Sequence, residues 1–278
     1  MNTDHPEVLI IGAAGFIASR LKENFHCVLC DQKIFSYEDT ERIWLQYKPK
    51  IVLNCVGHIG KDNVDDCEKD KSKNLLANTF VPIMLGELAI RHGFKLIHIS
   101  SGCIYHVDYK NPIPIKEEAL PDFLGLFYSR SKIYAEQSLS VLIPQANILI
   151  VRIRIPLDNR PYPKNILNKL IRYKKVIDVS NSVTYIPDFI QALKHLIQID
   201  AKGIYNVVNE GGLHYPQLMN VYQKYVPDFR YELMPLKDLN LVRTNLILST
   251  VKLQKSGFKV RPIAEVLEEC VQGFVSYS

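Results

Sequence analysis

The stretch that decides the fold is Val8-Leu-Ile-Ile-Gly-Ala-Ala-Gly-Phe-Ile-Ala18. Its first four residues form an apolar run typical of a buried strand, and the residues from Phe16 onward suit a helix. Gly12 and Gly15 permit a tight turn whose backbone N–H groups can approach a diphosphate at the start of that helix. Ala18 replaces the last glycine of the usual pattern, where a small residue allows close packing of helix on strand.

A second apolar strand, Cys27-Val-Leu-Cys30, ends at Asp31, which lies 19 residues after Gly12. An acid at this place accepts hydrogen bonds from the ribose hydroxyls of a dinucleotide and repels a 2′-phosphate. We therefore expect Gly12, Gly15, Phe16, Ile17 and Asp31 to bind NAD(H) or NADP(H), with Asp31 favouring NAD(H). An ordinary strand, turn and helix with an exposed Asp is the alternative.

Apolar runs and helix-type runs alternate through the first half of the chain. Strand-type runs occupy 51–56, 95–99, 147–156 and 203–208, and helix-type runs occupy 39–47, 78–91 and 128–142. This alternation predicts an α/β fold, a Rossmann-type doubly wound parallel sheet with right-handed crossovers. Gly93 follows one helical run in the position of a C-cap.

Regularity falls after Pro156, where turn-rich sequence is followed by helix-type runs at 165–175, 216–225 and 263–274. We predict a smaller, mostly helical substrate lobe there. The predicted dinucleotide-binding domain is 1–155, joined again by about 176–210. The predicted substrate-binding lobe is 156–175 and 211–278, interleaved with that domain.

Composition narrows the classes of function. The 278 residues are 47% hydrophobic and 23% charged, with a net charge of +5 and no block of Lys or Arg, so we expect no nucleic-acid partner. We also expect no signal peptide and no membrane span. The six Cys lack a CxxC pair and indicate reduced thiols in a cytoplasmic protein. No His/Asp/Glu cluster has ligand spacing, so we expect no metal.

The chemistry concentrates between residues 98 and 132. An apolar strand ends in Ser100-Ser101-Gly-Cys103, and a helix-type run then starts with Tyr128-Ser-Arg-Ser-Lys132. In a helix, Tyr128 and Lys132 share a face, and the ammonium favours the phenolate and lowers the phenol's pKa. Ser, Tyr and Lys together can hold a ketone and exchange its proton. An exposed i,i+4 pair on a helix is the alternative.

The loop after the third strand, from Gly57 to Glu68, lies at the carboxyl end of a sheet strand, where ligands bind in such folds. We expect Gly57 to face the cofactor. The acidic residues Asp65, Asp66 and Glu68 also suit a solvated helix start.

Taken together, these parts resemble the extended short-chain dehydrogenase/reductases, within them the dTDP-4-dehydrorhamnose reductase group, and most closely the bifunctional nucleotide-rhamnose synthases (UDP-4-keto-6-deoxy-glucose 3,5-epimerase/4-reductases). The likeness spans nearly the whole chain. General dehydrogenases of this class lack the segments 60–68 and 121–132. The segments that carry the likeness are Gly12–Ala18, Gly60–Glu68, Ser101–Tyr105, Pro121–Lys132, Val151–Pro156, Asn165–Lys169, Arg172–Val176 and Leu248–Leu253.

The resemblance implies a nucleotide-sugar substrate whose 4-keto group is reduced by NAD(P)H after inversion at C3 and C5. It gives Tyr128, Lys132 and Ser101 the reductive roles, and Cys103 and Lys169 the epimerising ones. The alternative for Cys103 is a small buried hydrophobe, and for Lys169 a solvated lysine on a basic helix. The matching segments further imply four substrate-binding residues: Asn63, Arg154, Asn165 and Arg172.

Three questions stay open on the sequence. A 4-reductase that needs a separate epimerase is the nearest rival function. A non-catalytic binding role is the second, because the regulatory subunit of methionine adenosyltransferase keeps this fold. The choices of UDP or dTDP, NADH or NADPH, product sugar, and monomer or homodimer are open as well.

Overall fold

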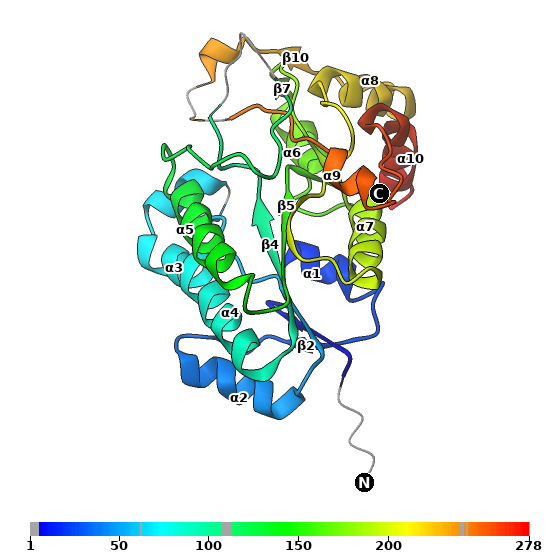
Figure 1. Cartoon of the computed structure of the whole chain (residues 1–278). Helices are drawn as coiled ribbons and strands as arrows, with labels where there is room; N and C mark the ends of the chain where they lie inside the picture. Colours follow the sequence, from blue (N-terminus) through cyan, green and yellow to red (C-terminus); the bar gives the residue numbers. More distant parts are fainter. Residues whose placement is uncertain (1–5, 62, 107–112, 240–241, 243, 278) are drawn as a thin grey trace. The chain divides into compact units, whose positions relative to one another are not determined.

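The computed structural model describes residues 6–61, 63–106, 113–239, 242 and 244–277 (Figure 1). Asp62 of the predicted ligand loop and residues 1–5 of the predicted first domain lie outside the described residues. The chain divides into two compact units. The first unit is 1–104, 121–151 and 200–205, and the second is 105–120, 152–199 and 206–278.

A six-stranded sheet in the order β2-β1-β3-β4-β5-β9 organises the first unit. The strand order reverses direction at β1, whose neighbours β2 and β3 both pair with it in parallel. This is the doubly wound α/β topology, so the predicted fold class is confirmed. The strands are β1 Val8–Ile11, β2 Cys27–Cys30, β3 Ile51–Asn54, β4 Lys95–Ser101, β5 Ile148–Ile153 and β9 Gly203–Asn206.

Helices cover both faces of this sheet, and Figure 1 shows α4 and α5 on one side of β4 and α1 on the other. A π-helical turn joins α3 to α4, so the predicted helix over 78–91 begins earlier and changes its winding midway. Among the described residues the helical segments are α1 Phe16–Leu21, α2 Tyr37–Tyr47, η1 Val64–Glu68, α3 Lys71–Leu75, η2 Leu76–Phe80, α4 Val81–His92 and α5 Phe127–Leu142.

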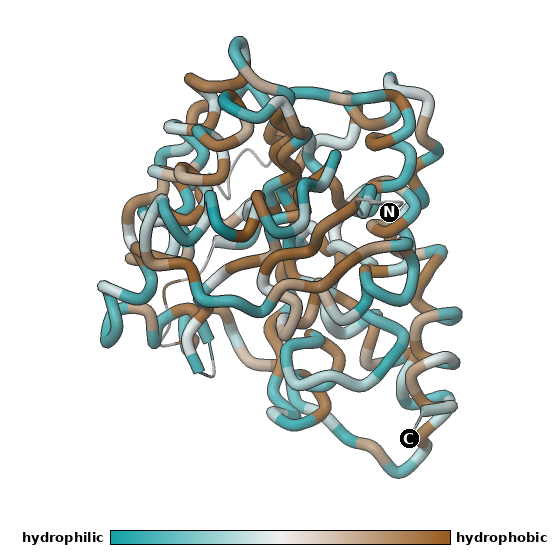
Figure 2. The backbone as a smooth tube through the Cα atoms, turned by 90° about the horizontal axis from the view of Figure 1, so that it is seen from below, coloured by the Kyte–Doolittle hydropathy of each residue, from teal (hydrophilic) through white to brown (hydrophobic). Residues whose placement is uncertain are grey.

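Local chemistry sets several of these boundaries. Ser36 and Asp39 form a capping box that starts α2, because the Ser36 side chain accepts from the Asp39 N–H and the Asp39 carboxylate accepts from the Ser36 N–H. Gly93 ends α4 in the left-handed conformation with φ of 72°, as its C-cap position predicts. Apolar strand residues pack against α2, α4 and α5 to form the core of this unit, and Figure 2 shows hydrophobic segments running through the interior of the trace.

The second unit has its own hydrophobic core, and its longer regular elements are helices. Two short parallel strand pairs, β6 with β8 and β7 with β10, link its helices. Its described elements are β6 Pro156–Leu157, α6 Ile166–Tyr173, β7 Lys175–Val176, β8 Thr184–Tyr185, α7 Ile186–Gln198, α8 Tyr215–Tyr225, β10 Glu232–Leu233, η3 Leu236–Asp238, α9 Val251–Lys255 and α10 Ile263–Ser276.

The division of the chain differs from the predicted one most in two segments. Residues 176–199, predicted to rejoin the first domain, group with the second unit, where Asp188 of α7 pairs with Arg261 and His195 bonds to Ser256. Residues 105–120 also group there, since Ile115 exchanges backbone hydrogen bonds with 247 and 249. Contacts between residues so distant in the chain leave no local sequence pattern.

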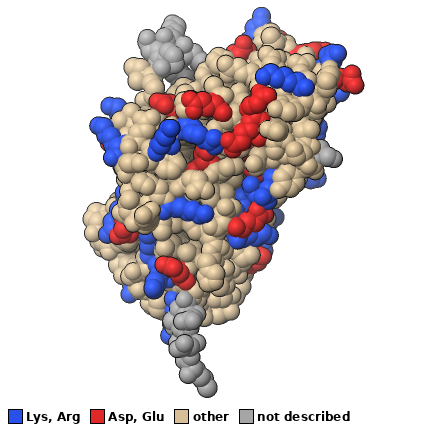
Figure 3. Space-filling model, turned by 90° about the vertical axis from the view of Figure 1, so that its right-hand side faces the viewer, with Lys and Arg blue, Asp and Glu red and all other residues tan. Residues whose placement is uncertain are grey.

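On the face shown in Figure 3, Lys and Arg side chains are interspersed with Asp and Glu, without a broad region of one sign. Over the described part of the chain, every helix is too short or too polar to cross a bilayer. The predicted compartment stays a prediction, and the choice between monomer and homodimer stays open.

Candidate active site

The glycine turn after β1 is built by close approach of two backbones. Gly12 has φ of +80°, and its N–H donates to the Cys30 carbonyl at 3.1 Å. A Cβ on Gly12 would lie 2.8 Å from the Val56 backbone nitrogen, a distance that real Cβ atoms do not adopt. Gly15 then caps α1 and donates to the Gly12 carbonyl at 3.1 Å. The turn therefore has the shape that lets backbone approach a diphosphate closely.

The residues around this turn fit a dinucleotide. Phe16 and Ala18 are buried under the turn, while Asp31 is exposed directly after β2. Gly57 follows β3, and a Cβ there would lie 4.0 Å from the Lys132 ammonium. A side chain larger than hydrogen at position 57 would therefore occupy the space beside the Lys132 ammonium.

Ser101 and Cys103 lie at the carboxyl end of the central strand. Ser101 is the last residue of β4 and is 6% exposed, and its Oγ accepts from the Cys103 N–H at 3.1 Å. The Cys103 thiol is partly exposed. Ser129 donates to the Cys103 carbonyl, which ties the first turn of α5 to this loop. Ser101, Cys103 and the residue next to Tyr128 are therefore joined by two hydrogen bonds.

Tyr128 and Lys132 both lie on the buried face of α5, with exposed fractions of 7% and 4%. The Lys132 ammonium donates to the Ile99 carbonyl at 3.3 Å. Burial lowers the pKa of Lys132 to about 8, and the nearby Glu136 carboxylate opposes that shift. The helix spacing thus places Tyr128 and Lys132 on one face, and the packing of α5 buries that face.

The loop after β3 fixes the start of the helix that carries Tyr128. Asn63 caps η1 by accepting from the Asp65 N–H at 2.9 Å. The Glu68 carboxylate at the end of η1 accepts from the Phe127 N–H at 2.8 Å and lies 3.5 Å from the Arg130 guanidinium. Glu68 therefore caps α5, whereas the sequence alone also allowed a solvated role.

Three of the predicted residues lie on or beside α6 in the second unit. Lys169 and Arg172 are one turn apart on this helix, and the Arg172 guanidinium lies 4.8 Å from the Tyr173 ring centroid. Asn165 is the N-cap, and its amide oxygen accepts from the Leu167 N–H at 3.1 Å. The Asn165 amide nitrogen donates to the carbonyls of Asp158 and Arg160, so backbone groups engage both ends of this side chain.

Arg154 lies in a buried polar network of the second unit and is 3% exposed. Its Nε donates to the Asn181 amide oxygen at 3.0 Å, and its Nη2 donates to the Thr244 hydroxyl at 3.2 Å and to the Thr244 carbonyl. The guanidinium is held in one orientation by these contacts. Any substrate contact from Arg154 would come from a fixed group.

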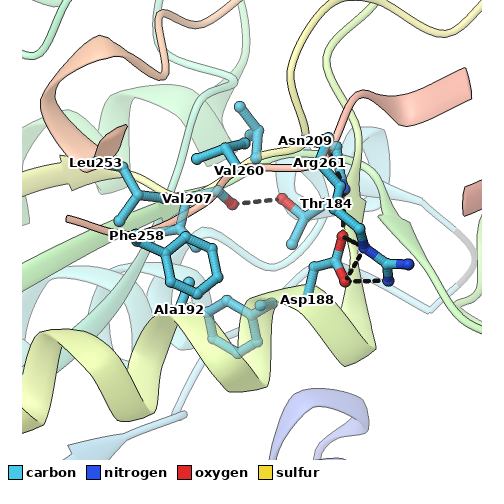
Figure 4. Close-up of a pocket in the computed structure, with 11 residues that line it drawn as sticks. Thr184, Asp188, Ala192, Val207, Asn209, Leu253, Phe258, Val260 and Arg261 are labelled. Carbon is cyan, nitrogen blue, oxygen red and sulfur yellow. Dashed lines mark hydrogen bonds and ion pairs between the residues drawn. The ribbon is translucent and has the colours of Figure 1, made fainter. Parts of the chain in front are cut away.

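A separate small cavity lies in the second unit (Figure 4). Apolar side chains such as Phe258 and Leu253 line one part of it, and the Asp188–Arg261 ion pair closes another. Asn209 donates to the same Asp188 carboxylate at 2.6 Å. Because these polar groups already bond to each other, the cavity is a packing feature of this unit and lacks convergent groups for a sugar nucleotide. The described residues contain no group of three His, Cys, Asp or Glu able to hold a metal.

Comparison with known proteins identifies the family. The family model described as "RmlD substrate binding domain" matches residues 6–218. The chain belongs to this family. It is an extended short-chain dehydrogenase/reductase of the dTDP-4-dehydrorhamnose reductase type, as the sequence motifs predicted.

Two similar proteins from Arabidopsis thaliana differ in length: the first is more than twice as long as this RmlD-family chain, and the second is of similar length. One relative is the trifunctional UDP-glucose 4,6-dehydratase/UDP-4-keto-6-deoxy-D-glucose 3,5-epimerase/UDP-4-keto-L-rhamnose-reductase RHM1. It is 29% identical over 95% of this chain, and this chain spans only 41% of the length of RHM1. The bifunctional dTDP-4-dehydrorhamnose 3,5-epimerase/dTDP-4-dehydrorhamnose reductase is 29% identical over 93% of this chain and 90% of its own.

Solved structures share the fold at lower identity. The L780 UDP-rhamnose synthase of Acanthamoeba polyphaga mimivirus superposes with a TM-score of 0.88 at 22% identity, covering 97% of this chain and 100% of its own. The dTDP-4-dehydrorhamnose reductase of Bacillus anthracis was solved in complex with NADP. It has a TM-score of 0.83 at 21% identity, and the superposition covers 98% of this chain and 99% of the Bacillus chain.

Sequence reasoning missed the contacts of three residues around this site: Asn78, Glu136 and Ser100, which bonds to Glu136. Asn78 in the π turn accepts from the His58 N–H and donates to the His58 carbonyl, both at 2.9 Å, and donates to Ser131 at 3.3 Å. It therefore joins the loop after β3 to the turn of α5 that carries Lys132. Ser100 donates to the Glu136 carboxylate at 3.0 Å. For Asn78 and Glu136, the available signal was a polar residue on the apolar face of a helix.

Proposed function

We propose that this chain converts an NDP-4-keto-6-deoxy-glucose, with UDP or dTDP as the nucleotide, to NDP-rhamnose by 3,5-epimerisation and 4-keto reduction with NADH or NADPH. One observation carries the proposal. A single unit holds Ser101, Tyr128 and Lys132 at the carboxyl end of the sheet, with the thiol-bearing Cys103 bonded to Ser101 through its own N–H.

The reduction uses these side chains in ordinary acid–base roles. The bound nicotinamide cofactor supplies a hydride to C4 of the sugar. Tyr128 donates its phenolic proton to the C4 oxygen, and the Lys132 ammonium stabilises the phenolate that remains. The Ser101 hydroxyl donates a hydrogen bond to the same oxygen and orients the carbonyl.

The epimerisation follows from the acidity of carbons next to a ketone. The 4-keto group makes the C3 and C5 protons removable, and a base on one face with an acid on the other inverts each centre. We propose Cys103 as the base, because its thiol is partly exposed, and Lys169 as the acid. Each inversion exchanges one carbon-bound proton for a solvent-derived proton and needs no oxidant.

Cofactor and substrate contacts complete the proposal. The exposed Asp31 carboxylate after β2 supports NADH over NADPH, since it repels a 2′-phosphate. Asn63, Arg154 and Arg172 are proposed to contact the sugar nucleotide. Asn165 is proposed to act on the substrate by holding the start of α6.

The test uses the purified chain with UDP- or dTDP-4-keto-6-deoxy-glucose and NADH or NADPH in D₂O. We expect nicotinamide oxidation by absorbance, and a rhamnose product with deuterium at C3 and C5 by NMR. Cys103→Ala and Lys169→Met should abolish deuterium uptake, and both should still reduce a substrate that another epimerase has inverted. Reduction only after a separate epimerase is added would leave a simple 4-reductase. Cofactor binding without turnover or exchange would contradict both activities.

A further inference from the structure

Glu136 is a buried carboxylate that the proposed chemistry does not use. It is 2% exposed, and among the described residues of the first unit no other Asp or Glu is buried. It follows Lys132 by one helical turn and Tyr128 by two, so the three side chains share one face of α5. Its Oε2 accepts from the Ser100 hydroxyl at 3.0 Å.

Burying a carboxylate is unfavourable unless a charge or hydrogen bonds compensate it. Lys132 is the buried ammonium closest in sequence, and the other buried lysine of this unit, Lys95, already pairs with Asp200 at 2.8 Å. Buried charges of opposite sign one turn apart on a helix attract each other in a medium that screens weakly. The Glu136 carboxylate is therefore the opposite charge on this face of α5, and its field raises the pKa of Lys132 against the effect of burial.

The titratable groups that face Lys132 from neighbouring strands are neutral. Burial raises the pKa of the Cys55 thiol, which follows β3, to about 12. Burial and the Lys132 charge lower the pKa of His98 on β4 well below its ordinary range, and its Nδ1 lies 3.2 Å from the Asn54 amide nitrogen. Neither group supplies a negative charge to Lys132.

Among the described residues, the remaining elements packed on α5 bring no other charge to this turn. The π turn contributes the uncharged Asn78 and Thr79, and α4 approaches through Gly86, where an added Cβ would lie 2.6 Å from Leu139. Charged residues of η1 and α3 meet the first turn of α5, where Glu68 lies 3.5 Å from Arg130 and the Lys71 ammonium lies 5.5 Å from the Phe127 ring centroid.

We propose that Glu136, held in place by Ser100, is a positioning residue that keeps the Lys132 ammonium protonated at neutral pH. It acts through Lys132, without touching substrate or cofactor. The catalytic meaning of this role rests on the proposed function, because a protonated Lys132 stabilises the phenolate of Tyr128 during proton donation. The charge coupling itself does not depend on any substrate.

The first test therefore needs no turnover. Protein labelled with ¹³C at the lysine ε-carbons gives an NMR signal for Lys132, assigned by its loss in Lys132→Arg, and the signal is followed against pH. In Glu136→Gln, which keeps the shape and removes the charge, we expect the titration midpoint of Lys132 to fall by about one pH unit or more. Glu7→Gln, which neutralises an exposed carboxylate of the same unit, should leave the midpoint unchanged. An unchanged midpoint in Glu136→Gln overturns the proposal.

The second test is the pH profile of kcat/KM. The alkaline limb of Glu136→Gln should move to lower pH, with a loss of about tenfold near pH 8 and little loss on the acid side. Glu136→Asp, which keeps the charge, should restore most of the wild-type profile. An equal loss at every pH would indicate a purely structural role and overturn the proposal. If the wild type shows no turnover, the proposed function fails, while the NMR titration still decides the role of Glu136.

A reciprocal variant covers the case in which Glu136→Gln does not fold. Lys132→Met leaves the Glu136 carboxylate buried without its counter-charge, so removing that carboxylate as well, in Lys132→Met/Glu136→Gln, should restore part of the lost stability. Urea denaturation of the two variants measures this difference. A double variant that is less stable than Lys132→Met overturns the coupling from the other side.

Discussion

Gly12→Ala is the substitution whose effect the structure specifies most directly. Two separate penalties meet at this position. An alanine at φ of +80° enters the left-handed region, which costs about 1–2 kcal/mol. The added Cβ would lie 2.8 Å from the Val56 nitrogen and 3.0 Å from the Cys55 carbonyl carbon, so backbone must move, at a further cost of about 1–3 kcal/mol. The expected loss of unfolding free energy is the sum of the two, about 2–5 kcal/mol.

Gly93→Ala is the matched control. Gly93 also has positive φ, at 72°, but no atom lies within 4 Å of the place that a Cβ would occupy, so only the conformational penalty of about 1–2 kcal/mol applies. Urea denaturation followed by circular dichroism measures both variants. Because Val56 directly precedes Gly57 beside Lys132, NADH titration by fluorescence should show weaker cofactor binding in Gly12→Ala alone. The reasoning is refuted if Gly12→Ala is no less stable than Gly93→Ala and binds NADH as well as the wild type does.

Three further predictions concern the site. Tyr128→Phe should lower kcat by about 10²–10⁴-fold because the proton donor is lost, while NADH affinity measured by fluorescence stays near the wild-type value; a small change in kcat would exclude Tyr128 as the acid. Asp31→Asn should shift the ratio of kcat/KM for NADPH over NADH upward by about 10-fold or more, since repulsion of a 2′-phosphate is removed, and an unchanged ratio would place the ribose elsewhere. Burial holds the pKa of Lys132 near 8 against its ordinary 10.5, so the folded state binds fewer protons than the unfolded state between these values. The contribution of Lys132 to unfolding free energy should therefore rise with pH across that window, and Lys132→Met should lose this slope in urea denaturation at several pH values.

The elements of the first unit could be predicted from local patterns. The run Val8–Ile11 followed by Gly12 and Gly15 forms the strand and turn that its residue types favour, because apolar patterning and glycine φ preferences act over a few residues. The same applies to Gly93, which ends α4 as its position indicated. The Tyr128–Lys132 spacing likewise determined a shared helix face without any tertiary information.

Other features depended on contacts between distant parts of the chain. The sequence allowed Tyr128 and Lys132 to lie on an exposed face, and only the packing of α5 on the sheet buries them. Glu68 caps α5 across 59 residues of chain, and Ser100 meets Glu136 across 36. No periodic pattern encodes such partners, so the sequence could not show that Glu68 bonds to Phe127 or that Glu136 is buried beside Ser100.

By itself, the sequence determined the α/β fold class, the glycine turn and the shared helix face of Tyr128 and Lys132, because each depends on residue type at short spacing. The tertiary structure decided which charges are buried together and which segments join each unit. Burial governs those outcomes, since removing the Lys132 ammonium from water lowers its pKa, and a buried carboxylate such as Glu136 needs compensating partners.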